Sequence, residues 1–449
     1  MLKKKLIICL CLITGVVFCG AAQETWTLEQ CIRYAYDNNI QLKQQQLAVE
    51  YAENDLLQSK LNILPNLNAS GTFNSGKGKV LDMETLTIVT GSTVNNFNGG
   101  ISSGVTFFRG LVKKNTIGYN LYSLLANMEN VEKSKNDLSI NIALYYLQIV
   151  HAQEQLTVAE NQLNLTLLQI DRTSALVDAG SVPEGNLFEI QSQAAREDLQ
   201  IVTARNALEL SRLNLAQLLD LDARTNFQVV VPDFSNMDIS DLFTSVDDIF
   251  ATAETTLPQV KAAELILKSV EKQLAIQRGY RSPSLSLSGG YTTRYSSIAK
   301  HPANPSEAYL FMDQLRDGVN SYINVGINIP IFNGWQINTS VKNAKLNVLN
   351  YQYQLQLTKN TLYKEIQQAY AEAVASMKKY DASAKAVASM EEAFRYTEQR
   401  FEVGLMNFVD YSTAKTRLTA AQSDLLQAKF EYIFKTKVLD FYNGRKITL

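Results

Sequence analysis

The chain contains a tandem duplication, and this feature limits its possible folds more than any other. Compared with itself at a shift of 218 residues, the chain aligns Pro65 with Pro283, and at a shift of 224 residues it aligns Gly180 with Gly404. Further apolar and glycine positions coincide around both pairs. Because equivalent segments of a duplicated chain form equivalent structural units, we expect two copies of one fold.

Each copy has the same order of expected elements: a helix, two strands joined by a loop, a long helix, a turn and a further helix. The loop between the first two strands contains the sequence GKGK at 76–79. The first repeat is predicted to span 23–221, with strands at about 66–75 and 98–108. A linker follows at 222–245. The second repeat is predicted to span 246–449, with strands at about 284–296 and 321–332.

The N-terminus has the layout of a secretory signal peptide over residues 1–22. Three lysines precede an apolar run of about a dozen residues, and small residues follow up to Ala22. Cleavage there leaves Cys31 as the one remaining cysteine, so no internal disulfide can form. An alternative is lipid attachment at Cys19, although a bulky Phe18 precedes it. No later stretch approaches the roughly 18 consecutive apolar residues of a transmembrane helix.

The expected strands alternate between apolar and small polar residues. In the first strand Leu67 and Phe73 alternate with Asn68 and Thr72. Strands of about nine to eleven residues with one apolar face are typical of outer-membrane barrels, but a half-buried sheet in a soluble protein alternates in the same way. Because the chain offers no other apolar surface to cover the sheet, and because it begins with an export signal, we favour membrane strands.

Four strands are too few to close a barrel. An open sheet edge in lipid leaves backbone groups without hydrogen-bond partners, and the smallest such barrels have about eight strands. The chain must therefore oligomerise: two copies would give eight strands, three would give twelve and four would give sixteen. The polar face of serine, threonine, asparagine and glycine predicts a water-filled interior.

The long helices carry apolar residues at alternating spacings of three and four. Rows that begin at Ile142 and at Ile366 continue in steps of seven, which is typical of a left-handed coiled coil. About 70 residues at about 1.5 Å each make a helix about 100 Å long. The rows stop at Gly180 and Gly404, and glycine readily adopts the left-handed conformation that ends a helix. Each repeat is therefore expected to form a helical hairpin with its tip at the glycine.

The duplicated unit and the signal peptide, together with two motifs, resemble the TolC family of outer-membrane efflux channels. The motifs are RFEVGLMNFVDY at 400–411 and TWTLEQCIRYAYDNN at 25–39. The resemblance covers the whole mature chain and implies a mainly α fold with a membrane β-barrel, in which a homotrimer closes twelve strands above a helical tunnel across the periplasm. It also implies contact with outer-membrane lipid, and partners in a periplasmic adaptor (membrane fusion protein) and an inner-membrane pump. The implied function is a passive, water-filled exit in a tripartite efflux or type I secretion system.

The resemblance also suggests roles for residues at the hairpin tips. Val403, Gly404 and Leu405 match the tip that the adaptor engages, and Gly180 is the counterpart of Gly404 in the first repeat. We expect these four residues to dock the adaptor.

A second set of residues matches the family's periplasmic aperture. Asp410 stands six residues after the glycine, where the family commonly places an acid that lines the tunnel mouth; Asn186 is its counterpart, and Glu189 follows Asn186 by three residues. Phe401 and Met406 occupy the places of a tyrosine and an arginine that latch the mouth in some members, so the resemblance predicts no polar latch here. Asp410 is also open to a simpler interpretation, as a helix-start carboxylate stabilised by the helix dipole.

Other classes of function find little support in the sequence. Lysine plus arginine number 42 and aspartate plus glutamate 44, so the chain lacks the basic character of a nucleic-acid binder. Neither His151 nor His301 belongs to a motif, and GKGK lacks the spacing of a phosphate-binding loop. We therefore expect no enzyme activity, cofactor or metal. The remaining alternative is a periplasmic coiled-coil scaffold anchored at the outer membrane.

Overall fold

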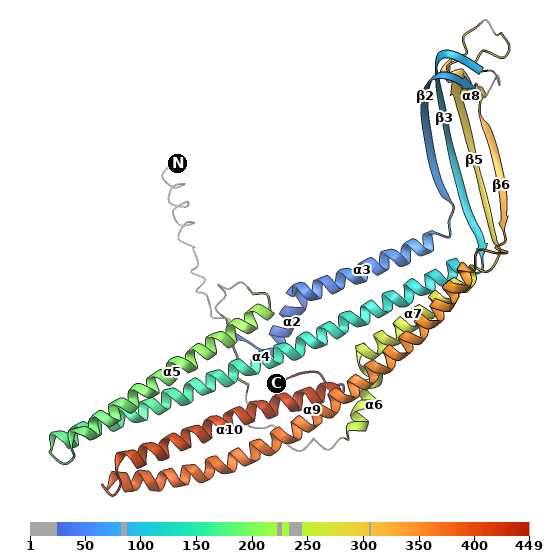
Figure 1. Ribbon diagram of the computed structural model, residues 1–449. Helices are drawn as coiled ribbons and strands as arrows, with labels where there is room; N and C mark the ends of the chain where they lie inside the picture. Colours follow the sequence, from blue (N-terminus) through green and yellow to red (C-terminus); the bar gives the residue numbers. More distant parts are fainter. Residues whose placement is uncertain (1–24, 82–87, 222–226, 233–244, 305–306, 449) are drawn as a thin grey trace, which may run out of the picture. The chain divides into compact units, whose positions relative to one another are not determined.

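The computed structural model describes residues 25–81, 88–221, 227–232, 245–304 and 307–448 (Figure 1). The predicted signal peptide, with Cys19, and most of the predicted linker lie outside these residues. The chain divides into two compact units, each with segments from both repeats. The helical unit comprises Met1–Gln46, Asn130–Pro258 and Lys359–Leu449, and the sheet unit comprises Leu47–Glu129 and Gln259–Thr358.

Equivalent helices have equal lengths in the two repeats, as a duplication requires. They contain 11, 22, 67 and 35 residues in each repeat, and they begin 218 positions apart before the strands and 224 positions apart after them. In the first repeat they are α2 Leu28–Asn38, α3 Ile40–Leu61, α4 Val112–Asp178 and α5 Glu184–Leu218, and in the second α6 Val246–Thr256, α7 Pro258–Gly279, α9 Gln336–Glu402 and α10 Phe408–Tyr442.

The expected single helix at the start of each repeat is wrong, because two helices stand there. In the first repeat the chain turns at Asn39, whose side-chain oxygen accepts a hydrogen bond from the Leu42 N–H at 3.0 Å and so caps α3. In the second repeat α7 begins at Pro258. The residue before a proline is disfavoured in the helical conformation, and Leu257 is accordingly extended (φ −75°, ψ 134°).

The core of the helical unit contains the predicted heptad rows. Ile142 and Ile149 of α4 and Ile366 of α9 are at most 1% exposed. A short parallel pair, β1 Thr25–Trp26 with β4 Gln228–Val229, lies beside them. The buried Tyr146 hydroxyl shares its proton between two carbonyl oxygens, that of Trp26 in β1 and that of Val230, the residue after β4. This contact ties the start of the first repeat to the segment that leaves it.

The sheet unit contains one antiparallel sheet with the order β2-β3-β5-β6, so that β3 of the first repeat pairs with β5 of the second. One face of this sheet is apolar and exposed in the single chain. Its side chains are 63–81% exposed at Leu67, Phe73, Phe107, Tyr291, Ile323, Val325 and Ile327. The strands are β2 Asn66–Leu81, β3 Ile88–Arg109, β5 Ser284–Ser296 and β6 Asn320–Asn328.

Three predicted strand ends are wrong. The second strand begins at Ile88 and not near 98. The first hairpin continues through GKGK, which belongs to β2 and not to the connecting loop, because the backbone of 76–81 pairs with β3 across a bulge at Gly78 and Lys79. The last strand ends at Asn328 instead of near 332. Pro330 follows, and a proline has no N–H for a strand ladder.

A short helix that the sequence did not predict, α8 Phe311–Asp317, lies beside the end of β5. The side-chain amide of Gln314 accepts a hydrogen bond from the Ser296 N–H at 2.8 Å and donates one to the Ser296 carbonyl at 3.1 Å. β6 begins opposite Thr292, so the last residues of β5 have no partner in β6. Gln314 takes the place of that partner for Ser296. No helix in the described part of the chain is both long and apolar enough to cross a membrane.

Candidate functional site

Both hairpin tips have the same glycine turn. Gly180 and Gly404 have φ values of +70° and +74°, in the left-handed region that favours glycine. In the first tip the Gly180 N–H donates to the Val177 carbonyl and the Ser181 N–H to the Leu176 carbonyl, both at 2.8 Å. The second tip repeats both bonds, which together form a Schellman motif. The predicted helix ends at the two glycines are confirmed.

The two tips differ in the side chains beside the glycine. In the second tip Val403 and Leu405 are 68% and 70% exposed, and Val409 is exposed close by. In the first tip small residues, Ala179 and Ser181, take the places of Val403 and Leu405. The second tip therefore has larger apolar side chains directly beside its glycine than the first tip has.

The candidate aperture residues lie at the starts of α5 and α10. Asn407 caps α10, with its side-chain oxygen accepting a hydrogen bond from the Asp410 N–H at 2.8 Å. The Asp410 side chain is exposed in the first turn of the helix, where the dipole favours a negative charge. In the first repeat Asn186 is half-buried and Glu189 is exposed. The Asp410 carboxylate is therefore placed to stabilise the start of α10, and its side chain remains accessible to solvent.

Phe401 belongs to an aromatic cluster next to the second tip, which we call the tip cluster. Its ring stacks on Tyr411, with centroids 4.5 Å apart and an interplanar angle of 21°. Phe408 and Ile190 are the buried neighbours in this cluster. Burial raises the pKa of the Tyr411 hydroxyl to about 12, and nearby Glu398, Glu197 and Glu402 act in the same direction. Phe401 therefore holds α9 against α10 and, through the cluster, against α5.

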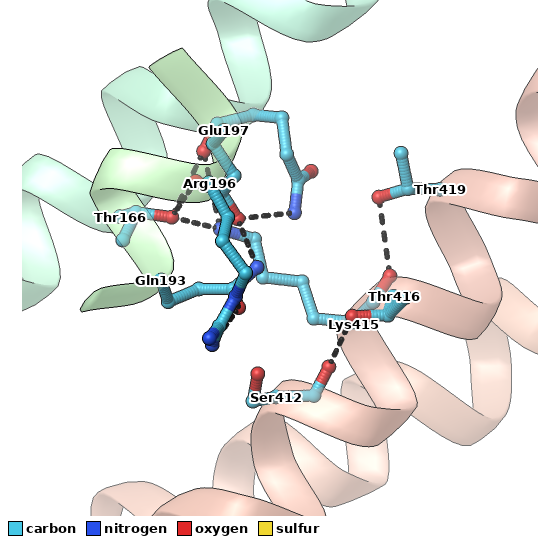
Figure 2. Close-up of polar contacts among 9 residues, drawn as sticks. Thr166, Gln193, Arg196, Glu197, Ser412, Lys415, Thr416 and Thr419 are labelled. Carbon is cyan, nitrogen blue, oxygen red and sulfur yellow. Dashed lines mark hydrogen bonds and ion pairs between the residues drawn. The ribbon is translucent and has the colours of Figure 1, made fainter. Parts of the chain in front are cut away.

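Sequence reasoning missed a second group of residues that join the two hairpins. Lys415 of α10 lies buried against Glu197 of α5 and Thr166 of α4 (Figure 2). Thr166 stands seven residues after Ala159 and seven before Thr173, in a second row of the same heptad pattern, and its polar side chain was a signal available in the sequence. An exposed ion pair at 2.8 Å between Arg172 and Glu402 joins the hairpins closer to the tips.

The polar face of the sheet borders a hollow of about 1160 Å³. Strand residues that line it include Ser70, Thr72, Asn98, Ser102, Thr292 and Asn320. Hydroxyl and amide side chains of this kind interact well with water and poorly with lipid. The two faces of the sheet thus suit two different solvents, as the alternation in the sequence predicted.

Comparisons with known proteins agree on one family. The profile of the family described as outer membrane efflux protein matches residues 31–220 and 251–436. The outer membrane efflux protein BepC of Brucella suis is 22% identical over 98% of this chain and 90% of its own length. The outer membrane protein TolC of Vibrio cholerae is 20% identical over 90% of this chain and 88% of its own. The CmeC outer membrane channel of Campylobacter jejuni has a similar structure, with a TM-score of 0.78 at 18% identity over 93% of this chain and 85% of CmeC.

The predicted resemblance to the TolC family is confirmed, since the family match covers most of both repeats. The family match also favours a channel over a coiled-coil scaffold without transport. The family is one of channels and not of enzymes. The chain therefore belongs to the outer membrane efflux protein family, and it is a TolC-like channel of the outer membrane in an efflux system.

Proposed function

We propose that three copies of the chain close a twelve-stranded barrel and form a passive, water-filled exit from the periplasm. The observation that carries this proposal is the open sheet, in which β2 and β6 each have one unpaired edge. The exposed apolar face supports a position in lipid, where unpaired backbone groups have no water to bind. Oligomerisation is therefore required before the strands are stable in the membrane.

The strand directions support closure by edge-to-edge contact between copies. The four strands alternate in direction, so β2 and β6 run antiparallel to each other. A β6 edge placed beside the β2 edge of another copy continues the antiparallel order, as in bacterial barrels with an even number of strands. Two, three and four copies all satisfy this rule, and the family resemblance favours three.

The tips provide the proposed contact with partner machinery. Val403 and Leu405 flank the Gly404 turn with exposed apolar side chains, and such a patch on a soluble surface marks an interaction site. We assign this tip, with Gly180 at the equivalent turn, to a periplasmic adaptor that links the channel to an inner-membrane pump.

The proposed aperture lies just above the tips. In a trimer, Asp410 would form a ring of three carboxylates, and rings of acids favour cations in narrow pores. Asn186 and Glu189 of the first repeat stand at the equivalent level. Phe401 contributes through the tip cluster, because its packing keeps α9 on α10. No catalytic role is proposed for any of these residues.

Cross-linking between the edge strands tests the barrel. A Thr72→Cys and Asn324→Cys variant places one thiol on β2 and one on β6, on the polar face, and a bifunctional thiol reagent should produce a ladder of products that ends at three chains. The matched control, Thr72→Cys with Ser288→Cys, moves the second thiol to the central strand β5 and should stay monomeric. Equal ladders in both variants, or a ladder that stops at two chains or continues past three, would contradict a closed trimer.

A further inference from the structure

Lys415 is a buried cation that joins the second hairpin to the first. Its side chain is 6% exposed and that of Glu197 is 2% exposed, with the Lys415 Nζ and the Glu197 Oε1 3.4 Å apart. The two residues are 218 positions apart in the chain. Lysine and glutamate are almost never fully buried unless they are paired. The pair therefore indicates a specific role for this contact.

The first hairpin provides an acceptor for every proton of the lysine. An ammonium group has three donors, and the Lys415 Nζ donates to the Thr166 hydroxyl, to the Gln162 carbonyl at 3.1 Å and to Glu197. None of these acceptors lies on α10, which carries the lysine, or on α9. The buried cation is thus satisfied entirely by the other hairpin.

Glu197 is satisfied in the same way. The Thr166 hydroxyl donates to its Oε2, and the Gln193 amide donates to its Oε1 at 2.9 Å (Figure 2). Burial lowers the pKa of Lys415, while the charge and the hydrogen bond of Glu197 act against this shift. Breaking a buried pair by removing one partner leaves an uncompensated charge, which is strongly destabilising.

The contact lies next to the tip cluster. Lys415 is seven residues beyond Phe408, the first residue of α10, or about 10 Å along the helix. Lys415 and Thr166 line one small cavity of about 10 Å³ together with Ile190, Phe408 and Tyr411. The polar contact and the tip cluster therefore form one junction between the hairpins.

Apolar rows do not by themselves define one position along a helix. A heptad pattern presents similar side chains every seven residues, and small residues add little shape to distinguish one position from the next. A buried donor reaches its acceptors at only one axial position of one helix on another. Fixing the register of packed helices is the best-attested use of such buried polar groups.

We propose that Lys415, Glu197 and Thr166 form a polar interlock that fixes the axial position of the second hairpin on the first. The interlock acts within one chain, so it is independent of the proposed trimer and of the adaptor. It determines the height at which the start of α10 stands relative to α5. Lys415 and Glu197 are thus positioning residues and do not themselves line a pore.

Distances between spin labels at the tips test the interlock directly. Arg172→Cys and Glu402→Cys place labels at a half-exposed ion pair between the hairpins, and Cys31 is fully buried and should not react. The full-length protein is purified with an excess of unlabelled chains, so that distances within one chain dominate. With the interlock intact we expect one narrow distribution.

The variant Lys415→Met with Glu197→Leu removes both charges and should still fold, because an apolar pair often replaces a buried ion pair without loss of stability. We expect this variant to show a second population, shifted by one heptad of seven residues, or about 10 Å. Lys415→Gln with Glu197→Gln also removes both charges but keeps groups that form hydrogen bonds, so it should shift a smaller fraction in the same direction and provides a test if the apolar pair fails to fold.

Lys435→Met is the matched control, because Lys435 pairs with Glu372 between α9 and α10 within the second hairpin. It should leave the distribution narrow. The proposal is overturned if the folded apolar variant, or the double glutamine variant in its place, gives the same distribution as the intact interlock. It is also overturned if Lys435→Met broadens the distribution equally.

Discussion

Replacing Phe401 with alanine should loosen the second tip and raise the conductance of the channel. The ring stacks on Tyr411 at 4.5 Å and lies 6.3 Å from Phe408. Truncating a fully buried phenylalanine costs about 3–5 kcal/mol. Phe401 is only partly buried, so about half of that, about 2 kcal/mol, is a reasonable size for the loss, and it corresponds to about a 30-fold change in the balance between packed and loosened tips.

The assay is single-channel recording in planar bilayers, with hydrogen exchange across the α9–α10 turn as the structural measurement. Phe401→Ala should spend more time in states of higher conductance, and the turn should exchange faster. Tyr396→Ala is the matched control, because Tyr396 is an exposed aromatic residue on α9 outside the tip cluster. If Phe401→Ala and Tyr396→Ala behave alike in both measurements, the tip cluster does not hold the aperture and the reasoning fails.

Three further predictions follow from other groups. Asp410→Asn should reduce cation preference and weaken block by divalent cations in bilayers, with little change in trimer stability; unchanged selectivity and block would leave Asp410 only a helix-start carboxylate. A bulky charged residue at Gly404 or Leu405 should abolish export while trimers still reach the outer membrane, and export that survives both changes would move the adaptor contact elsewhere. Burial lowers the pKa of His151, so the unfolded state binds a proton first and stability should fall as the pH drops below about 6.5. In thermal unfolding, His151→Leu should reduce the loss of stability between neutral and acidic pH. If the loss is unchanged in this variant, His151 is not its cause.

Much of the fold was predictable because the duplication and the side-chain periods act locally. The shift that aligns Gly180 with Gly404 also aligns the starts of α4 and α9, and the alternation around Leu67 identifies a strand without any knowledge of its partner. Local rules also explain some errors in retrospect. Pro258 and Pro330 were both visible signals for a helix start and a strand end.

The interlock was not predictable because it depends on contacts between distant segments. In the sequence, Lys415 looks like an ordinary charged residue on the solvent-exposed face of a helix. Only the packing of α10 on the first hairpin brings it within reach of Glu197 and Thr166. Gln314 is similar, since its role exists only where β6 stops short of the end of β5. The periodicity of a sequence predicts which face of a helix or strand is buried. It does not predict which residues of other elements pack against that face.

The stoichiometry of the complex tests the central claim most directly. Native mass spectrometry of the full-length protein, released from detergent that preserves strand circular dichroism, should show three chains and no folded monomer. Three chains give twelve strands and leave no sheet edge unpaired in lipid. A monomer that retains its strand signal in detergent would contradict the account, because the open edges of β2 and β6 would then need no partner.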